Sequence, residues 1–168
     1  MEEQIIEVDK YDNKIGLKPR DDFYKSNFIH RAVHLILFNS KNEILLQQRS
    51  SAKKVYPNLF TYSVDATVAN ESYEDCIQRE MKEELGISIN VKRVFTYPLF
   101  DTIDKAWHCV FVGKTDNKIT PEEREIQKVK WIGIDELKKD ILKSPNLYTP
   151  QLVEGIKKYF DDFYETKK

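Results

Sequence analysis

The sequence predicts an α/β (α+β) fold in which helices cover both sides of a central mixed sheet. Short runs rich in β-branched and aliphatic residues recur along the chain, with one helical pattern between them and two after them. This order of elements is typical of a sheet that buries each face against a helix layer. Only five glycines in 168 residues favour compact, regular elements over long flexible loops. The length is that of one ordinary domain.

The first half of the chain is expected to form strands. Weak alternation between Ile5 and Leu17, around a polar turn, predicts a small N-terminal hairpin at about residues 1–20. The apolar run at residues 31–38 predicts a buried strand, and residues 43–49 predict its neighbour after a short turn.

The second half is expected to alternate between strands and helices. Three short apolar runs predict strands, at residues 89–97, 106–112 and 128–132. A short helix is expected from a capping Asp135 to residue 142. A terminal helix is expected to open at Thr149 and Pro150, because proline in the first turn lacks only a donor that would be unpaired anyway. We therefore expect one domain over residues 1–168, with a hairpin at about 1–20, a core at about 28–145 and a C-terminal helix at about 149–165.

The composition excludes several functional classes. The 27 basic and 28 acidic residues give a net charge of −1, so a nucleic-acid duplex is not an expected partner. Cys76 and Cys109 have neither metal-ligand spacing nor a disulfide framework, and Cys76 is expected to be a small buried side chain. The N-terminus has no apolar segment for secretion, and no run approaches the ~20 apolar residues needed to span a bilayer. We therefore expect a cytoplasmic protein with no membrane partner.

An unusual concentration of negative charge lies in the first predicted helix. Glu80, Glu83 and Glu84 stand at i, i+3 and i+4, beside the apolar stripe of that helix. Like charges at this spacing repel by roughly 0.2–0.5 kcal/mol per pair, and partial burial makes the repulsion more costly. A divalent cation such as Mg²⁺ would remove the repulsion, because carboxylates together with water and phosphate oxygens are its usual ligands. The alternative is a solvated helix in which Arg79 forms salt bridges.

The wider pattern around these acids resembles the Nudix box, G-x5-E-x7-R-E-U-x-E-E-x-G-U, where U is a bulky aliphatic residue. Eight of its nine specified positions match, namely Glu71, Arg79, Glu80, Met81, Glu83, Glu84, Gly86 and Ile87. The one departure is the first position, where Asp65 replaces glycine. The segment 63–72 contains no glycine, so we expect the loop before the helix to be rebuilt.

The resemblance covers about residues 28–145 and implies a Nudix-type α/β/α sandwich with a central mixed sheet. It implies a Mg²⁺-dependent hydrolase, with Mn²⁺ as an alternative metal, that cleaves the diphosphate linkage of a nucleoside diphosphate derivative or similar small diphosphate by water attack. Glu80, Glu83 and Glu84 would be the principal metal ligands, and Arg79 would orient one of them. Glu71 would support the junction before the helix or reach the metal through water. Relatives are often homodimers, so a homodimer is compatible with the resemblance.

Two further segments are candidates for the site. Many relatives carry a glutamate before a late strand, and Glu125 is the best positional match for a catalytic base, ahead of Glu122 and Glu123. Arg49 follows a predicted strand, where it suits contact with a substrate phosphate, assisted by the lysines at 53 and 54. The alternative for both segments is a solvated charged loop.

Histidine and aromatic side chains give a weaker signal. His30, His34 and His108 have no metal-ligand spacing, and His34 is expected to be a hydrogen-bonded structural imidazole in an apolar strand. Tyr97, Phe100 and Trp107 offer planar faces for stacking on a base or another planar group, although packing in the core or at its rim is the commoner role. The aromatic side chains therefore do not identify the substrate.

Two alternative functions remain open at this point. Residues 30–50 also resemble the first part of isopentenyl diphosphate isomerases, and His30 matches one of their metal-binding histidines. Their active-site cysteine and Gly-His pair would fall within residues 63–69, and their downstream acid near Ala106 or Trp107, but neither group is present. The other alternative is a catalytically weakened Nudix-fold binding module, which only the change at Asp65 favours.

Overall fold

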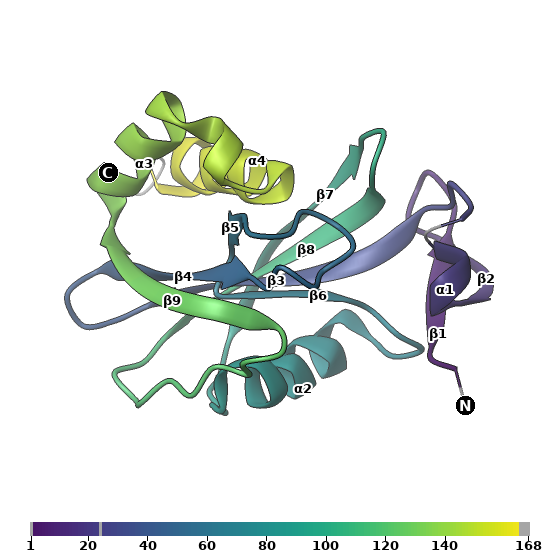
Figure 1. The fold of residues 1–168 in the computed structure, drawn as a ribbon, viewed down its shortest axis with the longest axis horizontal. Coiled ribbons are helices and arrows are strands. Elements are labelled where there is room, and N and C mark those ends of the chain that lie inside the picture. Colours follow the sequence, from purple (N-terminus) through teal and green to yellow (C-terminus); the bar gives the residue numbers. More distant parts are fainter. Residues whose placement is uncertain (1, 24, 165–168) are drawn as a thin grey trace.

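A computed structural model describes residues 2–23 and 25–164 of the chain. It begins with a two-stranded antiparallel sheet, β1 (Gln4–Val8) and β2 (Lys14–Pro19), followed by a short helix α1 (Arg20–Phe23). The predicted N-terminal hairpin is therefore confirmed. The hairpin lies at one end of the main sheet (Figure 1), and an isolated bridge between Val8 and Ile29 joins it to the start of β3.

The main sheet has seven strands. Its order is β5-β4-β3-β8-β7, with β6 paired to β3 and β9 paired to β4. These strands are β3 (His30–Phe38), β4 (Glu43–Arg49), β5 (Phe60–Thr61), β6 (Val64–Thr67), β7 (Lys92–Phe100), β8 (Lys105–Lys114) and β9 (Ile126–Gly133). The pair β3–β8 is parallel and the other pairs are antiparallel, so the sheet is mixed as predicted.

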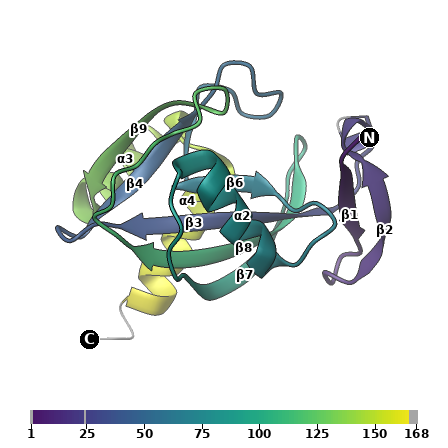
Figure 2. The ribbon, with the colours of Figure 1, turned by 90° about the horizontal axis from the view of Figure 1, so that it is seen from below.

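Helices cover both faces of this sheet. Helix α2 (Tyr73–Leu85) lies on one face, whereas α3 (Ile134–Lys143) and α4 (Pro150–Lys158) lie on the other (Figures 1 and 2). Alternate side chains of β3 serve the two layers, because Leu35 belongs to the core under α2 and Ile36 to the core under α4. The α/β/α sandwich implied by the sequence is confirmed.

The ends of the helices follow local sequence signals in most cases. The Ser72 hydroxyl accepts a hydrogen bond from the Asp75 backbone at the start of α2, and Gly86 ends that helix with φ of 67°. Thr149 caps α4 with Pro150 in its first turn, as predicted. The prediction for α3 was wrong in one respect: its N-cap is Gly133, and Asp135 lies inside the first turn.

The C-terminal helix packs unusually close to the sheet. A Cβ atom on Gly155 would lie 1.6 Å from the Tyr62 hydroxyl oxygen, so only glycine allows this approach. The same hydroxyl donates a hydrogen bond to the backbone carbonyl of Gln151. After α4 the chain continues in a wider π-helical turn, Tyr159–Tyr164, and the last residue of the predicted helix, 165, lies outside the described part.

Four short elements of the described chain were not predicted, namely α1, β5, β6 and the 3-10 helix Pro145–Leu147. The strand β6 occupies part of the segment that was expected to be a rebuilt loop, and it pairs with β3 over Ala32–Leu35. Their brevity explains the omission, because two to four residues carry no measurable periodicity. Within the described ranges, no helix has the length and apolar character to cross a bilayer.

Candidate active site

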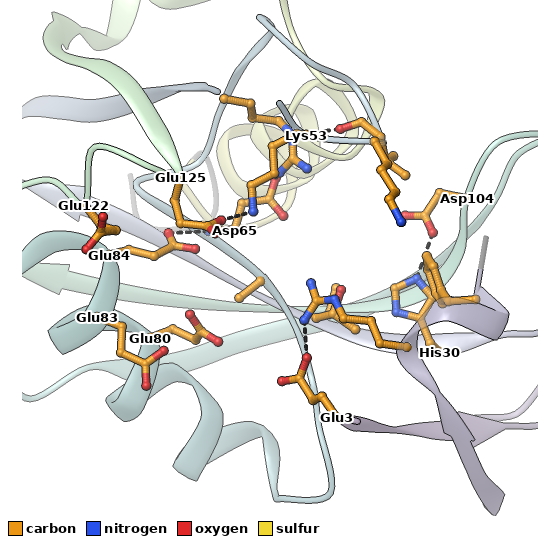
Figure 3. A pocket seen from close by; sticks show the side chains of 18 of the residues that line it. Glu3, His30, Lys53, Asp65, Glu80, Glu83, Glu84, Asp104, Glu122 and Glu125 are labelled. Carbon is orange, nitrogen blue, oxygen red and sulfur yellow. Dashed lines mark hydrogen bonds and ion pairs between the residues drawn. The ribbon is translucent and has the colours of Figure 1, made fainter. Parts of the chain in front are cut away.

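A cavity of about 710 Å³ lies between α2, the end of β4 and the loop that follows β4. We call this cavity the pocket. Distant parts of the chain line it, because residues from the segments 20–23, 49–55, 65–67 and 122–125 join residues of α2 in its lining. Figure 3 shows the glutamates of α2 on one side of the pocket and the His30–Asp104 pair on the other.

Glu84 is the most deeply buried acid of the pocket. Its side chain accepts hydrogen bonds from the Gln47 amide at 2.7 Å and from the Asp65 backbone N–H at 3.3 Å, and the residue is 5% exposed. Burial, reinforced by the charge of Glu80, raises the pKa of Glu84 to about 8. A carboxylate in this position is costly until a cation neutralises it.

Arg79 organises the remaining acids of the Nudix-like pattern. Its guanidinium lies 2.5 Å from Glu71, 2.7 Å from Glu80 and 2.9 Å from Glu83. Glu80 and Glu83 line the pocket, whereas Glu71 is outside its lining. The geometry of Glu71 therefore suits support of the junction before α2 better than contact with a metal.

The donor set of the pocket fits a hard divalent ion. Among residues 2–23 and 25–164, the side chains as they stand bring no three carboxylate, histidine or cysteine donors around one point. Glu80, Glu83 and Glu84 nevertheless share the helix face that lines the pocket, and Arg79 draws the first two toward itself. Burial also raises the pKa of Glu80 in spite of Arg79. Clustered, partly buried carboxylates are the ligands that Mg²⁺ or Mn²⁺ accepts.

Cationic side chains form another wall of the pocket. Arg49 is 11% exposed, donates from Nε to the Val55 carbonyl at 3.1 Å, and lies 3.7 Å from Asp65. Lys53 and Lys54 follow on the same loop and also line the pocket. Burial, together with the neighbouring Arg49 charge, lowers the pKa of Lys53. The wall therefore suits an anion such as a phosphate group.

The three candidate glutamates before β9 differ in their position relative to the pocket. Glu125 and Glu122 line the pocket, and Glu125 forms an ion pair with Lys53. The Glu122 backbone N–H donates to the Glu84 carbonyl at 2.9 Å, which fastens this loop to the end of α2. Glu123 is outside the lining of the pocket. Glu125 thus lies where a base or a metal-reaching acid would be needed, while its role stays a prediction.

The histidines, which have no recognisable spacing in sequence, converge in space. Parallel pairing of β3 and β8 places Ala32 opposite His108, so that His34 Nε2 lies 2.8 Å from His108 Nδ1. His30 lies 2.7 Å from Asp104, and both His30 and His108 line the pocket. The expectation of a hydrogen-bonded, buried His34 is confirmed. The other two belong to the pocket, which spacing along the chain could not reveal.

Asp65, the residue that departs from the family pattern, is buried beside this cluster. Its backbone is within strand β6 and has no positive φ, so glycine is not needed there. The carboxylate accepts hydrogen bonds from Thr61 at 2.5 Å and from Gln151 at 3.1 Å. Although burial opposes its charge, His34 and Arg49 hold the pKa of Asp65 well below its usual range.

The remaining aromatic and cysteine candidates lie outside the pocket. Tyr97 is buried against α4, and neither it nor Phe100 nor Trp107 lines the pocket. Both cysteines are buried, and burial raises the pKa of each thiol, to about 11 for Cys109. Cys76 is therefore the small buried side chain that was expected.

Comparison with known proteins decides the family. A family model described as the NUDIX domain matches residues 28–152. The chain belongs to the Nudix family. It is 44% identical over 162 residues to a prenyl-diphosphate phosphatase of Methanosarcina mazei, covering 94% of this chain and 95% of that protein. These matches identify it as a Nudix hydrolase.

Other similarities of this Nudix hydrolase are more distant. It is 30% identical to an isopentenyl-diphosphate Delta-isomerase of Photorhabdus laumondii over 155 residues, or 89% of this chain and 88% of that one. A solved structure from Deinococcus radiodurans superimposes with a TM-score of 0.78 at 23% identity, covering 92% of this chain and 97% of the other. This last likeness confirms the Nudix-type fold.

Proposed function

We propose that this chain is a Mg²⁺-dependent hydrolase that cleaves the diphosphate of a small organic diphosphate, of the prenyl class, by attack of water. The single observation that carries the proposal is the pocket itself, whose lining combines Glu80, Glu83 and Glu84 with Arg49 and Lys53. A diphosphate bridges two such walls, because it binds a divalent cation on one side and basic side chains on the other.

The residues of each wall have separate tasks in this proposal. Glu80, Glu83 and Glu84 would hold the ion, and Arg79 would orient the first two through its ion pairs with them. The bound ion supplies phosphate charge neutralisation and lowers the pKa of a coordinated water. Arg49 and Lys53 hold the phosphate groups, and Glu125 lies beside Lys53, where it can accept a proton from water.

Two observations favour a prenyl group over a nucleoside. The relative at 44% identity is named a prenyl-diphosphate phosphatase. The apolar part of the pocket lining comes from Phe23, Ala32, Val55 and Ala66, while Tyr97, Phe100 and Trp107 lie outside it. The three aliphatic side chains suit a flexible hydrocarbon, whereas a planar base is usually held between two aromatic rings and Phe23 offers one.

A substrate panel tests the proposal. Prenyl diphosphates of increasing chain length, ADP-ribose, nucleotide sugars, dinucleotides and nucleoside triphosphates would be assayed for phosphate or monophosphate release with Mg²⁺, with Mn²⁺ and with EDTA. We expect metal-dependent turnover that is highest with a prenyl diphosphate. Higher kcat/KM with a nucleotide would reject the prenyl assignment, and turnover that persists in EDTA would reject the metal.

The runner-up is an isopentenyl diphosphate isomerase-like activity, which the relatives at about 30% identity favour. The pocket weakens this alternative, because the buried Asp65 stands in the segment where the cysteine of those enzymes would fall. An isomerase moves a double bond and keeps both phosphates. Product analysis by NMR therefore separates the two activities in one assay.

Three broader assignments accompany the proposal. We infer that residues 1–168 act as one catalytic domain, because the hairpin supplies Glu3 and α4 supplies Gln151 to the same pocket. The predicted cytoplasmic location and the homodimer have no support beyond the sequence. Fractionation and light scattering would test them directly.

A further inference from the structure

Part of the pocket is built by residues that lie outside the matched Nudix domain. The family model begins at residue 28, whereas Glu3, Arg20, Asp21 and Phe23 all line the pocket. These four residues come from the segment that contains the N-terminal hairpin and α1. Among the described residues, Phe23 is the one phenylalanine, tyrosine or tryptophan in the lining. A ligand that fills the pocket therefore meets a surface that the matched domain alone does not provide.

Phe23 lies at the end of the pocket that is away from the glutamates of α2. Its ring packs edge-on against the ring of His30, with centroids 4.1 Å apart and an angle of 80° between the planes. Phe28, which does not line the pocket, makes a second edge-on contact with Phe23 at 5.4 Å. Figure 3 shows His30 across the pocket from the labelled glutamates of α2. The Phe23 ring is therefore held far from the end where a metal-bound diphosphate is expected.

Strand β3 connects the two ends of the pocket. Side chains alternate along a strand, so His34, Ala32 and His30 point to the same face of β3. His34 lies 3.4 Å from Asp65, whose backbone N–H donates to a glutamate of α2, whereas His30 contacts the ring of Phe23. Four residues of strand span about 13 Å. An extended hydrocarbon advances roughly 1.2 Å per bond, so this path matches about ten bonds, or about two to three isoprene units.

The charges along this path are compensated within the protein. His108 lies opposite Ala32 in the register of β3 and β8, and burial lowers its pKa to about 3, so its ring is uncharged at neutral pH. Charged side chains near Phe23 are paired with one another, namely Arg20 with Glu3, Lys54 with Asp21 and His30 with Asp104. A hydrocarbon beside paired charges desolvates less than it would beside an isolated charge. This end of the pocket therefore suits a tail, and the α2 end suits a metal.

We propose that Phe23 is a specificity-determining residue, which packs against the end of the prenyl tail and limits that tail to about two to three isoprene units. The inference rests on the proposed hydrolysis of prenyl diphosphates and deepens it. The diphosphate would lie at the metal end, and the tail would follow β3 over Ala32 until it meets the ring. A phenylalanine offers a large apolar face for this contact. Chain length is then selected by a segment outside the matched Nudix domain.

Chain-length profiles of two opposite variants test the proposal. We would measure kcat/KM with dimethylallyl, geranyl, farnesyl and geranylgeranyl diphosphate for the unmodified enzyme, Phe23→Ala and Phe23→Trp. Phe23→Ala should raise the ratio of geranylgeranyl to geranyl diphosphate at least roughly tenfold, because one methylene in an apolar pocket changes kcat/KM by about 10- to 200-fold. Phe23→Trp should lower the same ratio. The same ratio in all three folded proteins would overturn the proposal.

Phe28→Leu is the matched control for these variants. Phe28 contacts the Phe23 ring without lining the pocket, and leucine keeps an apolar contact there. We expect a lower melting temperature and a chain-length ratio within about twofold of the unmodified enzyme. A shift as large as that of Phe23→Ala would show that loosening of the segment, and not contact with the tail, sets the ratio. That result would also overturn the proposal.

Fluorescence of Phe23→Trp reports contact with the tail directly. Difference spectra against the unmodified enzyme, which carries Trp107 and Trp131, would be recorded with Mg²⁺ and a slowly hydrolysed farnesyl thiolodiphosphate. We expect a blue shift with this ligand and no shift with methylenediphosphonate, which has no tail. Identical spectra with both ligands would contradict the proposed contact.

The two levels of the proposal fail in different ways. Turnover of prenyl diphosphates with unchanged chain-length ratios in the Phe23 variants would reject the role of Phe23 and leave the proposed function intact. Absence of prenyl diphosphate turnover in the unmodified enzyme would reject the proposed function, and the role of Phe23 with it.

Discussion

The two charged walls of the pocket are built in different ways. The acidic wall stands on α2, which has a hydroxyl cap at Ser72, a glycine stop at Gly86 and an apolar face buried in the core. The cationic wall stands on the loop after Arg49, where Tyr56 and Asn58 adopt positive φ angles of 50° and 66°. Hydrogen bonds and ion pairs hold that loop, including the hydrogen bond of 2.5 Å from the Tyr56 hydroxyl to Asp101 and the ion pair of Lys53 with Glu125.

This difference indicates a division of labour between the walls. Metal ligands must be held within a fraction of an ångström, and a packed helix achieves this better than a loop. Phosphate binding tolerates more movement, because a flexible ammonium can follow its anion. Strained positive φ angles at non-glycine residues cost about 1–3 kcal/mol each, so the loop keeps its form only where the surroundings enforce it. Changes to the acidic wall should therefore affect kcat, and changes to the cationic wall should affect mainly KM.

The largest effect is expected from Glu84→Gln. Glutamine keeps an acceptor for Gln47 and the Asp65 backbone but removes a metal-ligating charge, so hydrolysis should fall at least about 10³-fold while the fold persists. The metal-free melting temperature should not fall, because burial, which raises the pKa of Glu84 to about 8, already favours an uncharged side chain at this position. Thermal melts with and without Mg²⁺ check this, since the stabilisation by metal should disappear.

Glu83→Gln extends the same test to a more exposed ligand. We expect loss of hydrolysis with a normal melting temperature, because Glu83 is more than half exposed and contributes mainly an exposed ion pair to Arg79. Glu74→Gln on the same helix is the control, since Glu74 pairs with Arg93 away from the pocket. Full activity in both Glu83→Gln and Glu84→Gln would reject the metal-ligand assignment.

Arg49→Lys and Arg49→Met probe the start of the cationic wall. Arg49 holds both the Val55 carbonyl and Asp65, and a lysine cannot reproduce that fork of donors. We expect kcat/KM to fall roughly 10²-fold for Arg49→Met and less for Arg49→Lys, mostly through KM. Steady-state kinetics with a prenyl diphosphate provide the measurement. A pure kcat effect would show that Arg49 belongs functionally with the acidic wall.

Variants of Lys53 and Glu125 test whether the two members of this ion pair have different functions, one in phosphate binding and the other in catalysis. Lys53→Met should raise KM about tenfold, whereas Glu125→Gln should lower kcat if Glu125 is the base. Both residues are partly exposed, so melting temperatures should change little. If both variants change only KM, and by the same factor, Glu125 is not the catalytic base.

The smallest effect is expected from Tyr56→Phe. Loss of the hydroxyl frees the loop from Asp101 without changing any pocket charge, so KM should rise about two- to fivefold and kcat should stay constant. Hydrogen exchange should quicken over residues 50–58 and remain unchanged in α2. A fall in kcat would show that the two walls are more tightly coupled than their construction indicates.

The acidic wall could be predicted from the sequence because it is local. Residues four apart on a helix must share a face, so Glu80 and Glu84 needed no tertiary information. Thr149 and Gly86 marked helix ends for the same reason. Arg49 lines the pocket at the end of β4, and its contact with a substrate phosphate stays a prediction.

The histidine cluster could not be predicted, because it depends on strand register. His34 and His108 are 74 residues apart, and only the parallel alignment of β3 with β8 brings their rings together. The strand β6, which adds Asp65 to the group, is too short to leave a periodic signal. Glu71 and Glu123 show a limit of sequence patterns. Glu71 matches the Nudix box and Glu123 lies close to Glu125 in sequence, but neither residue lines the pocket.

The close packing of Gly155 against Tyr62 has a practical consequence for the design of truncated versions of the protein. The family match ends at residue 152, which suggests a convenient place to trim. Trimming there would discard Ile156 and Phe160, whose packing keeps Gln151 against Asp65. A truncated protein that ends at residue 152 should therefore have a disturbed pocket, because Gln151 lines it. An affinity tag is better placed at the N-terminus, with the last helix kept.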